Sequence, residues 1–162
     1  MREIRYSISF LEFDSPDELS QSDRELLSKA GEAVSSAYAP YSHFLVGAAV
    51  RLKSGEIVTG SNQENMAFPS GMCAERVAIF SAAANHPDQP VEAIAITARS
   101  DAFAVEEPVP PCGACRQSLV EYEMKYQQKI RIILRGESGR ILVFDEIGSL
   151  LPMAFREDGL KK

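Results

Sequence analysis

Three cysteines constrain the fold of this 162-residue chain more than any other feature. Cys73 stands alone, whereas Cys112 and Cys115 form a C-x-x-C pair directly after Pro111. One thiolate and one such pair supply three ligands for a zinc ion and leave its fourth tetrahedral position open. An open position is typical of catalytic zinc sites, whereas structural sites are normally closed by four protein ligands. The sequence therefore predicts a fold that brings residue 73 close to residues 112–115.

Glu75 is the candidate catalytic residue, because it stands two positions after Cys73. A carboxylate beside an open metal position can accept a proton from water that the metal activates. The two histidines, His43 and His86, stand in segments typical of turns, so neither is an obvious fourth ligand. Two plainer interpretations stay open at this point. Glu75 can be an exposed acid in a first helical turn, and the cysteines can be small buried hydrophobic residues.

The composition indicates a single acidic domain with an apolar core. Hydrophobic residues make up 45% of the chain, and the net charge is −6 with a pI near 5.0. Proteins that bind polynucleotide phosphates need a basic stripe. The sequence shows none, so we expect a small substrate and no nucleic acid.

The expected location is the cytoplasm. Residues 1–20 lack the apolar segment of a signal peptide, and the chain has no apolar run of about 18 residues, so we expect neither secretion nor a membrane partner. An odd number of cysteines argues against a disulfide framework, and thiolates reserved for a metal suit a reducing compartment.

Hydrophobic periodicity predicts alternating strands and helices. We expect strands at 44–52, 56–59, 91–98, 130–134 and 141–144, with an additional short strand at 4–10 where apolar and polar residues alternate. Helices are expected at 22–39, 73–85 and 112–127, and a short last helix near residue 150. Ser22 followed by Glu25 matches a capping box for the first helix, and Asp145 is the expected cap of the last.

Strand–helix–strand units of this length require crossover connections, with helices on both faces of a sheet. We therefore expect an α/β fold, a three-layer α/β/α sandwich around a mixed five-stranded sheet. Residues 21–162 are expected to form its single domain, preceded by an N-terminal extension, residues 1–20. Cys73 and Cys112 would open two neighbouring helices, whose dipoles would offset part of the thiolate charge. Arg76 is expected to donate a hydrogen bond to a ligand sulfur.

Several motifs, in order along the chain, resemble those of a known enzyme family. They are Cys73-Ala74-Glu75-Arg76 and the segment 111–117, together with the segments 39–44, 46–49, 62–65 and 150–152. In this combination the chain resembles the zinc nucleoside deaminases, in particular the small homotetrameric cytidine deaminases, over about residues 22 to 160. The chemistry of zinc deaminases pairs the metal with a glutamate that is not a ligand.

The resemblance implies a hydrolase of pyrimidine salvage that converts cytidine and 2′-deoxycytidine to the uridine forms and releases ammonia. It implies one zinc ion per subunit on Cys73, Cys112 and Cys115, and a proton shuttle at Glu75. It also implies a homotetramer with shared active sites. The implied substrate contacts are Phe44 and the Ala74 amide to the base, Asn62 and Glu64 to the ribose hydroxyls, and Phe155 to the base in a neighbouring subunit's pocket.

The chain departs from the family pattern at three positions. Leu45 stands where the family usually has proline, and Met66 and Phe68 stand where alanine and tyrosine are common. The change at Phe68 removes a hydroxyl group and with it one potential polar contact.

Other functions are compatible with parts of the sequence. A deaminase of a nucleoside-like antibiotic such as blasticidin S shares the metal motifs, although the Asn-x-Glu-Asn pattern of residues 62–65 favours ribose. A structural zinc or partner-binding module would need a fourth ligand and would not need Glu75. A thiol redox protein would use Cys112 and Cys115 but would leave Cys73 and Glu75 unexplained.

Overall fold

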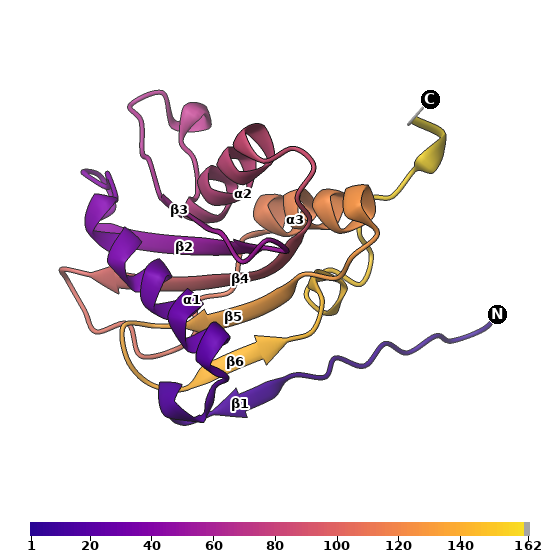
Figure 1. The fold of residues 1–162 in the computed structure, drawn as a ribbon, viewed down its shortest axis with the longest axis horizontal. Helices are drawn as coiled ribbons and strands as arrows, with labels where there is room; N and C mark the ends of the chain where they lie inside the picture. Colours follow the sequence, from indigo (N-terminus) through magenta and orange to yellow (C-terminus); the bar gives the residue numbers. More distant parts are fainter. Residues whose placement is uncertain (161–162) are drawn as a thin grey trace.

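A six-stranded sheet forms the middle layer of the structure, a computed structural model in which residues 1–160 are described (Figure 1). Its order is β1-β6-β5-β4-β2-β3, and β4 with β5 is the parallel pair. The strands are β1 (Leu11–Phe13), β2 (Phe44–Leu52), β3 (Ile57–Ser61), β4 (Val91–Ser100), β5 (Arg131–Arg135) and β6 (Ile141–Phe144).

Helices cover both faces of this sheet, as the sequence predicts. Helix α1 (Gln21–Ala33) packs on one face, where Leu26 and Ala30 meet Ile133. Helices α2 (Ala74–Asn85) and α3 (Gly113–Tyr126) lie together on the other face, with Ile79 and Leu119 in one buried cluster (Figure 1). The three-layer α/β/α class is confirmed. None of the helices within residues 1–160 is long and apolar enough to cross a membrane.

The N-terminal strand lies further along the chain than its alternating pattern predicts. Residues 4–10 form no strand, and β1 begins at Leu11, where it pairs with Val143 of β6. The reason is the partner: β6 has only four residues, so the alternation from Ile4 to Phe10 extends past its end. The strand β1 makes the sheet six-stranded where five strands were expected.

Two predicted caps are also wrong. Ser20, not Ser22, caps α1, since its hydroxyl accepts the Asp23 N–H at 3.2 Å. Glu146, not Asp145, precedes the short 3₁₀ turn Ile147–Ser149. Asp145 is engaged elsewhere, because its carboxylate binds Arg131 at 2.8 Å.

The topology places the starts of α2 and α3 at the same edge of the sheet. Strands β3 and β4 are both antiparallel to β2, so they run in the same direction. Because α2 follows β3 and α3 follows β4 along the chain, both helices begin beyond the carboxyl ends of these strands. Crevices at the carboxyl ends of strands are the usual ligand sites of α/β sheets.

A glycine on β3 sets how closely α2 approaches the sheet. A Cβ atom at Gly60 would lie 2.5 Å from the Ala78 nitrogen and 2.7 Å from the Ala74 carbonyl oxygen. Both distances are shorter than real Cβ contacts, so a larger side chain would push the helix away. The absence of a side chain at Gly60 therefore lets α2, which begins after Cys73, pack close to the sheet.

Candidate metal centre and active site

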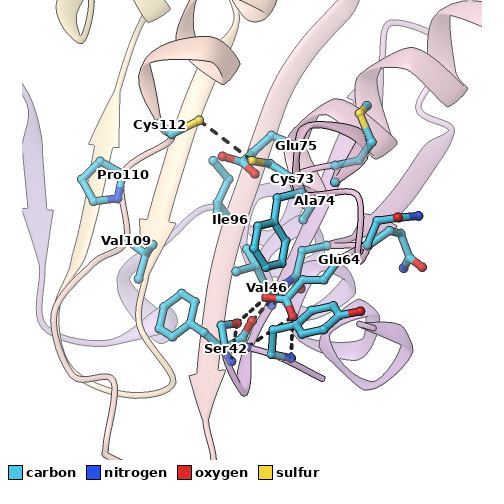
Figure 2. A pocket seen from close by; sticks show the side chains of 18 residues that line it. Ser42, Val46, Glu64, Cys73, Ala74, Glu75, Ile96, Val109, Pro110 and Cys112 are labelled. Atoms are coloured by element: carbon cyan, nitrogen blue, oxygen red, sulfur yellow. Dashed lines mark hydrogen bonds between the residues drawn. The ribbon is translucent and has the colours of Figure 1, made fainter. Parts of the chain in front are cut away.

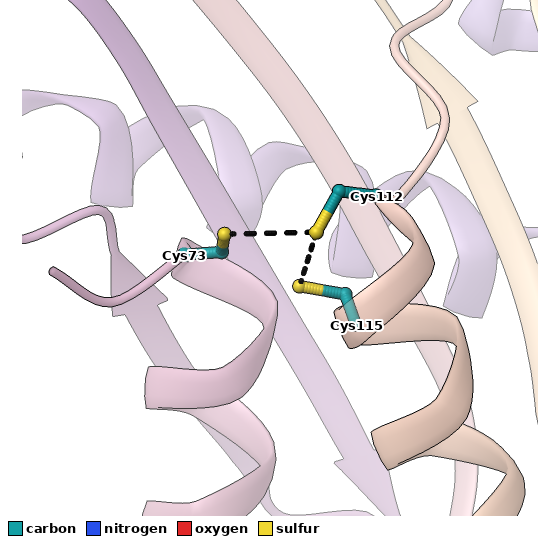
Figure 3. Close-up of side chains that lie close together, drawn as sticks. All are labelled: Cys73, Cys112 and Cys115. Carbon is teal, nitrogen blue, oxygen red and sulfur yellow. Dashed lines mark hydrogen bonds between the residues drawn. The ribbon is translucent and has the colours of Figure 1, made fainter. Parts of the chain in front are cut away.

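The three cysteine sulfurs meet between the starts of α2 and α3 (Figure 3). Cys73 is the N-cap of α2, Cys112 is the N-cap of α3, and Cys115 lies in the first turn of α3. The Cys73 Sγ lies 3.9 Å from the Cys112 Sγ, which lies 3.5 Å from the Cys115 Sγ. All three ligand atoms lie within 4.8 Å of one another. Two sulfurs that share a tetrahedral zinc ion at about 2.3 Å each lie about 3.8 Å apart, so the cluster fits zinc.

The close approach of the sulfurs shifts the pKa values of two of the thiols in opposite directions. A hydrogen bond from the Cys115 thiol, with smaller contributions from Arg76 and Cys112, lowers the pKa of Cys73 to about 5. The same interaction with Cys73 raises the pKa of Cys115. The two thiols therefore do not ionise independently of each other. Three thiolates require a soft divalent cation in their midst, and zinc is such an ion.

Arg76 lies beside the cluster, on the first turn of α2. Its Nη2 atom is 4.0 Å from the Cys73 Sγ and 3.4 Å from the Gly71 carbonyl oxygen. Its Nε atom is buried and has no hydrogen-bond partner among residues 1–160. The guanidinium group therefore has donors available for a thiolate, and its charge opposes the excess negative charge of three sulfurs.

Glu75 is buried beside the sulfurs, with 5% of its surface exposed. Burial raises the pKa of its carboxyl group, and the negative charge on Cys73 adds to this effect. The interpretation of Glu75 as an exposed acid is therefore wrong. A carboxyl group whose pKa lies nearer neutrality exchanges protons more readily at the pH of the cell.

The plainer interpretation of the cysteines fails as well. Cys115 is buried, but Cys73 is half-buried and Cys112 is exposed. Small hydrophobic residues of a core would all be buried. The cluster found among the described residues contains these three side chains and no histidine. His86 lies instead near Glu56, 3.4 Å from its carboxylate, and His43 occupies a turn with positive φ. A dithiol redox site at Cys112 and Cys115 would not require a third cysteine, yet Cys73 lies in the same cluster.

A pocket of about 510 Å³ opens in front of the cluster, within the range of small-molecule sites. Cys73, Cys112 and Glu75 lie at one end, and Ser42 and Glu64 lie at the other (Figure 2). The wall between the two ends is largely apolar and comes from three segments of the chain: its residues include Val46, Ile96, Val109 and Pro110. A ligand of this pocket thus needs an apolar or aromatic middle and a polar end.

Glu64 supplies a fixed carboxylate at the far end of the pocket. It accepts hydrogen bonds from the Tyr41 N–H at 2.9 Å, the Ser42 N–H at 3.3 Å and the Ser42 hydroxyl. The hydroxyl contact is the main reason why the pKa of Glu64 lies below its ordinary value. An ionised carboxylate that is held in place by its neighbours is suited to accept hydrogen bonds from ligand hydroxyl groups.

Asn62 lines the same pocket, and its amide also binds the β2 backbone. Its Oδ1 atom accepts the Val46 N–H at 2.8 Å, and its Nδ2 atom donates to the Phe44 carbonyl at 2.9 Å. An amide has two donors and two acceptor sites. One hydrogen and one lone pair therefore stay available for a ligand.

The remaining expected contact residues divide into two groups. Phe44 and Ala74 line the pocket, and Ala74 is the first residue of α2, where backbone N–H groups have no partner within the helix. Phe155 is 69% exposed and does not line the pocket of its own chain. The Gln117 side chain holds its backbone, donating to the Phe155 carbonyl at 2.9 Å and accepting its N–H at 3.0 Å.

Arg116 and Gln117, in the segment 111–117, make contacts that the sequence interpretation missed. Arg116 donates to the carbonyl oxygens of Pro111 and Leu150, each at 2.8 Å. Through these bonds Arg116 and Gln117 connect the start of α3 to the C-terminal segment, residues 150–155. Their place directly after Cys115 is the signal that could have drawn attention to them, but their partners in that segment lie more than thirty residues away.

The fold and the site define a class of zinc-dependent hydrolytic enzymes, in which three sulfur ligands leave one metal position open beside a carboxyl group. A family model, the cytidine and deoxycytidylate deaminase zinc-binding region, matches residues 20–128, and the chain belongs to this family. The family, the enzyme class and zinc as cofactor are confirmed.

Individual relatives support the same conclusion. A cytidine deaminase of Halalkalibacterium halodurans is 39% identical over 139 residues, which are 85% of this chain and 98% of the relative. A cytidine deaminase of Sporosarcina psychrophila is 36% identical over 136 residues, 84% of this chain and 93% of the relative. The crystal structure of a cytidine deaminase from Burkholderia pseudomallei matches with a TM-score of 0.72 and 36% identity, covering 85% of this chain and all of that one.

Proposed function

We propose that this protein hydrolyses cytidine and 2′-deoxycytidine to uridine and 2′-deoxyuridine, with release of ammonia. The observation that carries the proposal is one pocket that joins a three-sulfur cluster and a buried glutamate at one end to a fixed carboxylate at the other. A pyrimidine nucleoside has the matching form, with a reactive aromatic ring and a hydroxyl-rich sugar. The relatives named cytidine deaminase support the same substrate.

Cys73, Cys112 and Cys115 would hold one zinc ion per subunit. The bound ion lowers the pKa of a water molecule and so supplies a nucleophile at neutral pH. Arg76 and the positive ends of α2 and α3 offset the charge of three thiolates, which would otherwise weaken the cation.

Glu75 moves the protons of the reaction. Its carboxylate accepts a proton from the water whose oxygen bonds to C4 of the base, and passes this proton to N3. It then carries the second water proton to the amino group at C4. The bond from C4 to nitrogen breaks, ammonia leaves, and the C4 carbonyl of uridine forms. Burial, which raises the pKa of this carboxyl group, suits a group that must take up and release protons in turn.

The rest of the pocket orients the nucleoside. We assign Phe44 and the Ala74 N–H to the base, and Asn62 and Glu64 to the ribose hydroxyl groups. The backbone and hydroxyl donors around Glu64 keep its carboxylate ionised and fixed, so it can accept from a sugar hydroxyl without reorganisation. These contacts place C4 near the sulfur cluster at the opposite end of the pocket.

We propose further that the chain acts as a homotetramer in the cytoplasm, in pyrimidine salvage. Phe155 is a large apolar side chain that stays exposed although Gln117 fixes its backbone, which suits insertion into a neighbouring subunit's pocket. Sedimentation of the zinc-loaded protein is expected to give a single species of four chains. A fully active monomer would remove Phe155 from the substrate contacts.

Direct assay of the zinc-loaded protein tests the proposed reaction. Ultraviolet absorbance and ammonia release are expected to show conversion of cytidine and 2′-deoxycytidine, with one ammonia for each nucleoside consumed. Cytosine, which lacks the sugar, and blasticidin S serve as comparison substrates and are expected to react much more slowly, since Glu64 and Asn62 then have no ribose to bind. A folded, zinc-loaded sample that leaves cytidine untouched would favour a zinc-dependent binding module instead.

A further inference from the structure

Phe103, which does not line the pocket, stacks on Phe44, the side chain that we propose contacts the base. Phe103 lies in the loop between β4 and α3, and its ring centroid is 6.2 Å from that of Phe44, with 24° between the ring planes. Phe44 lines the pocket, whereas Phe103 does not line it and is 60% exposed. The same loop reaches the pocket wall at Val109 and Pro110.

Before Phe103, the end of β4 fixes the course of this loop. The Asp101 N–H points to the His43 carbonyl at 3.5 Å, and the Ala102 N–H donates to the Ser100 hydroxyl at 3.2 Å. Ser100 pairs with Phe44 in the β2–β4 ladder. The chain therefore turns immediately after the residue opposite Phe44, which brings Phe103 back over it.

After Phe103, the turn between β5 and β6 holds the loop. Val105 is buried, and its carbonyl accepts the N–H groups of Glu137 at 2.7 Å and Ser138 at 3.4 Å. A Cβ atom at Gly136 would lie 2.1 Å from this carbonyl oxygen, so the contact depends on a glycine there. With both flanks anchored, Phe103 occupies a defined place although its ring is exposed.

The backbone of Phe44 is held independently of Phe103. Its N–H donates to the Ser42 hydroxyl at 3.1 Å, and its carbonyl accepts from the Asn62 amide. These bonds fix the start of β2 but leave the Phe44 side chain free to rotate. A stacked aromatic neighbour restricts that rotation, since ring pairs prefer defined offset geometries.

We propose that Phe103 is a positioning residue, which holds the Phe44 ring in the orientation that meets the pyrimidine base. The proposal rests on the proposed function, because it assigns Phe103 to the base subsite of that same pocket. An exposed ring adds little to the folding core, so its effect falls on ligand affinity rather than on stability. Phe103 does not line the pocket that contains Glu75, Cys73 and Cys112, so we expect the rate of the chemical step to stay unchanged.

Three substitutions separate ring stacking from apolar bulk. Phe103→Ala and Phe103→Leu are expected to raise KM for cytidine about threefold to tenfold, the range that an aromatic pair supports, with kcat within about twofold of the parent. Phe103→Tyr keeps the ring and is expected to restore the parent KM. The control is Phe10→Ala, which removes an exposed ring that pairs with the buried Phe144 ring at a centroid distance of 5.2 Å, away from the pocket. It is expected to leave KM unchanged.

A second readout is the affinity for the product uridine, measured by calorimetry on the zinc-loaded proteins, which should fall in parallel with KM. Unchanged KM and uridine affinity in Phe103→Ala, or parent values in Phe103→Leu, would overturn the proposal. A parent that neither converts cytidine nor binds uridine would instead overturn the proposed function, and the role of Phe103 with it. All variants are expected to unfold near the temperature of the parent. If the unfolding temperature fell only in Phe103→Ala and Phe103→Leu, in step with the rise in KM, Phe103 would have a role in folding instead.

Discussion

Replacement of Glu75 by glutamine is expected to lower kcat for cytidine by about 10²-fold to 10⁴-fold, the usual contribution of a positioned acid–base group. The amide has nearly the same shape and can still form hydrogen bonds, but it cannot accept a proton from water and return it to N3 or to the leaving amino group. Because no sulfur ligand changes, zinc content should stay at one ion per chain. The loss should therefore appear in turnover and not in metal binding.

Steady-state kinetics, with metal analysis of the same samples, measures both quantities for Glu75→Gln. Glu25→Gln is the matched control, since this exposed glutamate lies on α1, across the sheet from the pocket, and its neutralisation should leave kcat unchanged. Burial of the Glu75 carboxyl group costs free energy when it is ionised, so the glutamine variant should unfold at the same or a higher temperature. Turnover within about tenfold of the parent would contradict the shuttle role.

The parts of the fold that were predictable are those where local pattern and tertiary contact agree. The bounds of β2 and β6 match the expected 44–52 and 141–144, because both are apolar runs closed by clear turn signals. The helix starts at Cys73 and Cys112 were predictable because ligand spacing and helix geometry impose the same boundary. The alternation at residues 4–10 misled because a strand also needs a partner, and β6 ends too early to provide one.

The site was predictable in its chemistry and less so in its supports. A cluster of three cysteine sulfurs with a glutamate beside it was predicted from residue type and spacing, and the structure shows this arrangement. The pairing of Gln117 with the Phe155 backbone, and of Phe103 with Phe44, depends on the path of a loop and of the C-terminal segment. No periodicity encodes those paths, since they are set by single hydrogen bonds such as those to the Val105 carbonyl. Contacts between segments far apart in the sequence, such as Gln117 with the Phe155 backbone, are thus the part of a site that a sequence pattern does not reveal.

Replacement of Cys115 by alanine should have the largest effect, because it removes a ligand and not only a proton carrier. Cys115 is fully buried in the first turn of α3, so water cannot easily take the place of its sulfur. Zinc content is expected to fall from one ion per chain to well below half, and kcat to fall below that of Glu75→Gln. The parent should also gain stability on addition of zinc, by about 2.7 kcal/mol at a free concentration a hundredfold above Kd, and the variant should lose this response.

Metal analysis after dialysis, and thermal unfolding with and without added zinc, measure these losses. Ser118→Ala is the control within the same helix: it removes a hydroxyl that donates to the Ala114 carbonyl at 2.9 Å and leaves all three sulfurs in place. A chelator should bring the parent to the state of Cys115→Ala, and added zinc should then restore the parent but not the variant. Comparison of zinc loss and turnover loss in Cys115→Ala and Glu75→Gln shows whether the three sulfurs hold the metal. If Cys115→Ala kept its zinc and its turnover, two sulfurs would suffice to hold the metal, and the third would belong to the core of α3. If zinc and turnover fall together while Glu75→Gln loses turnover alone, the sulfurs hold the cation and the carboxyl group carries the protons.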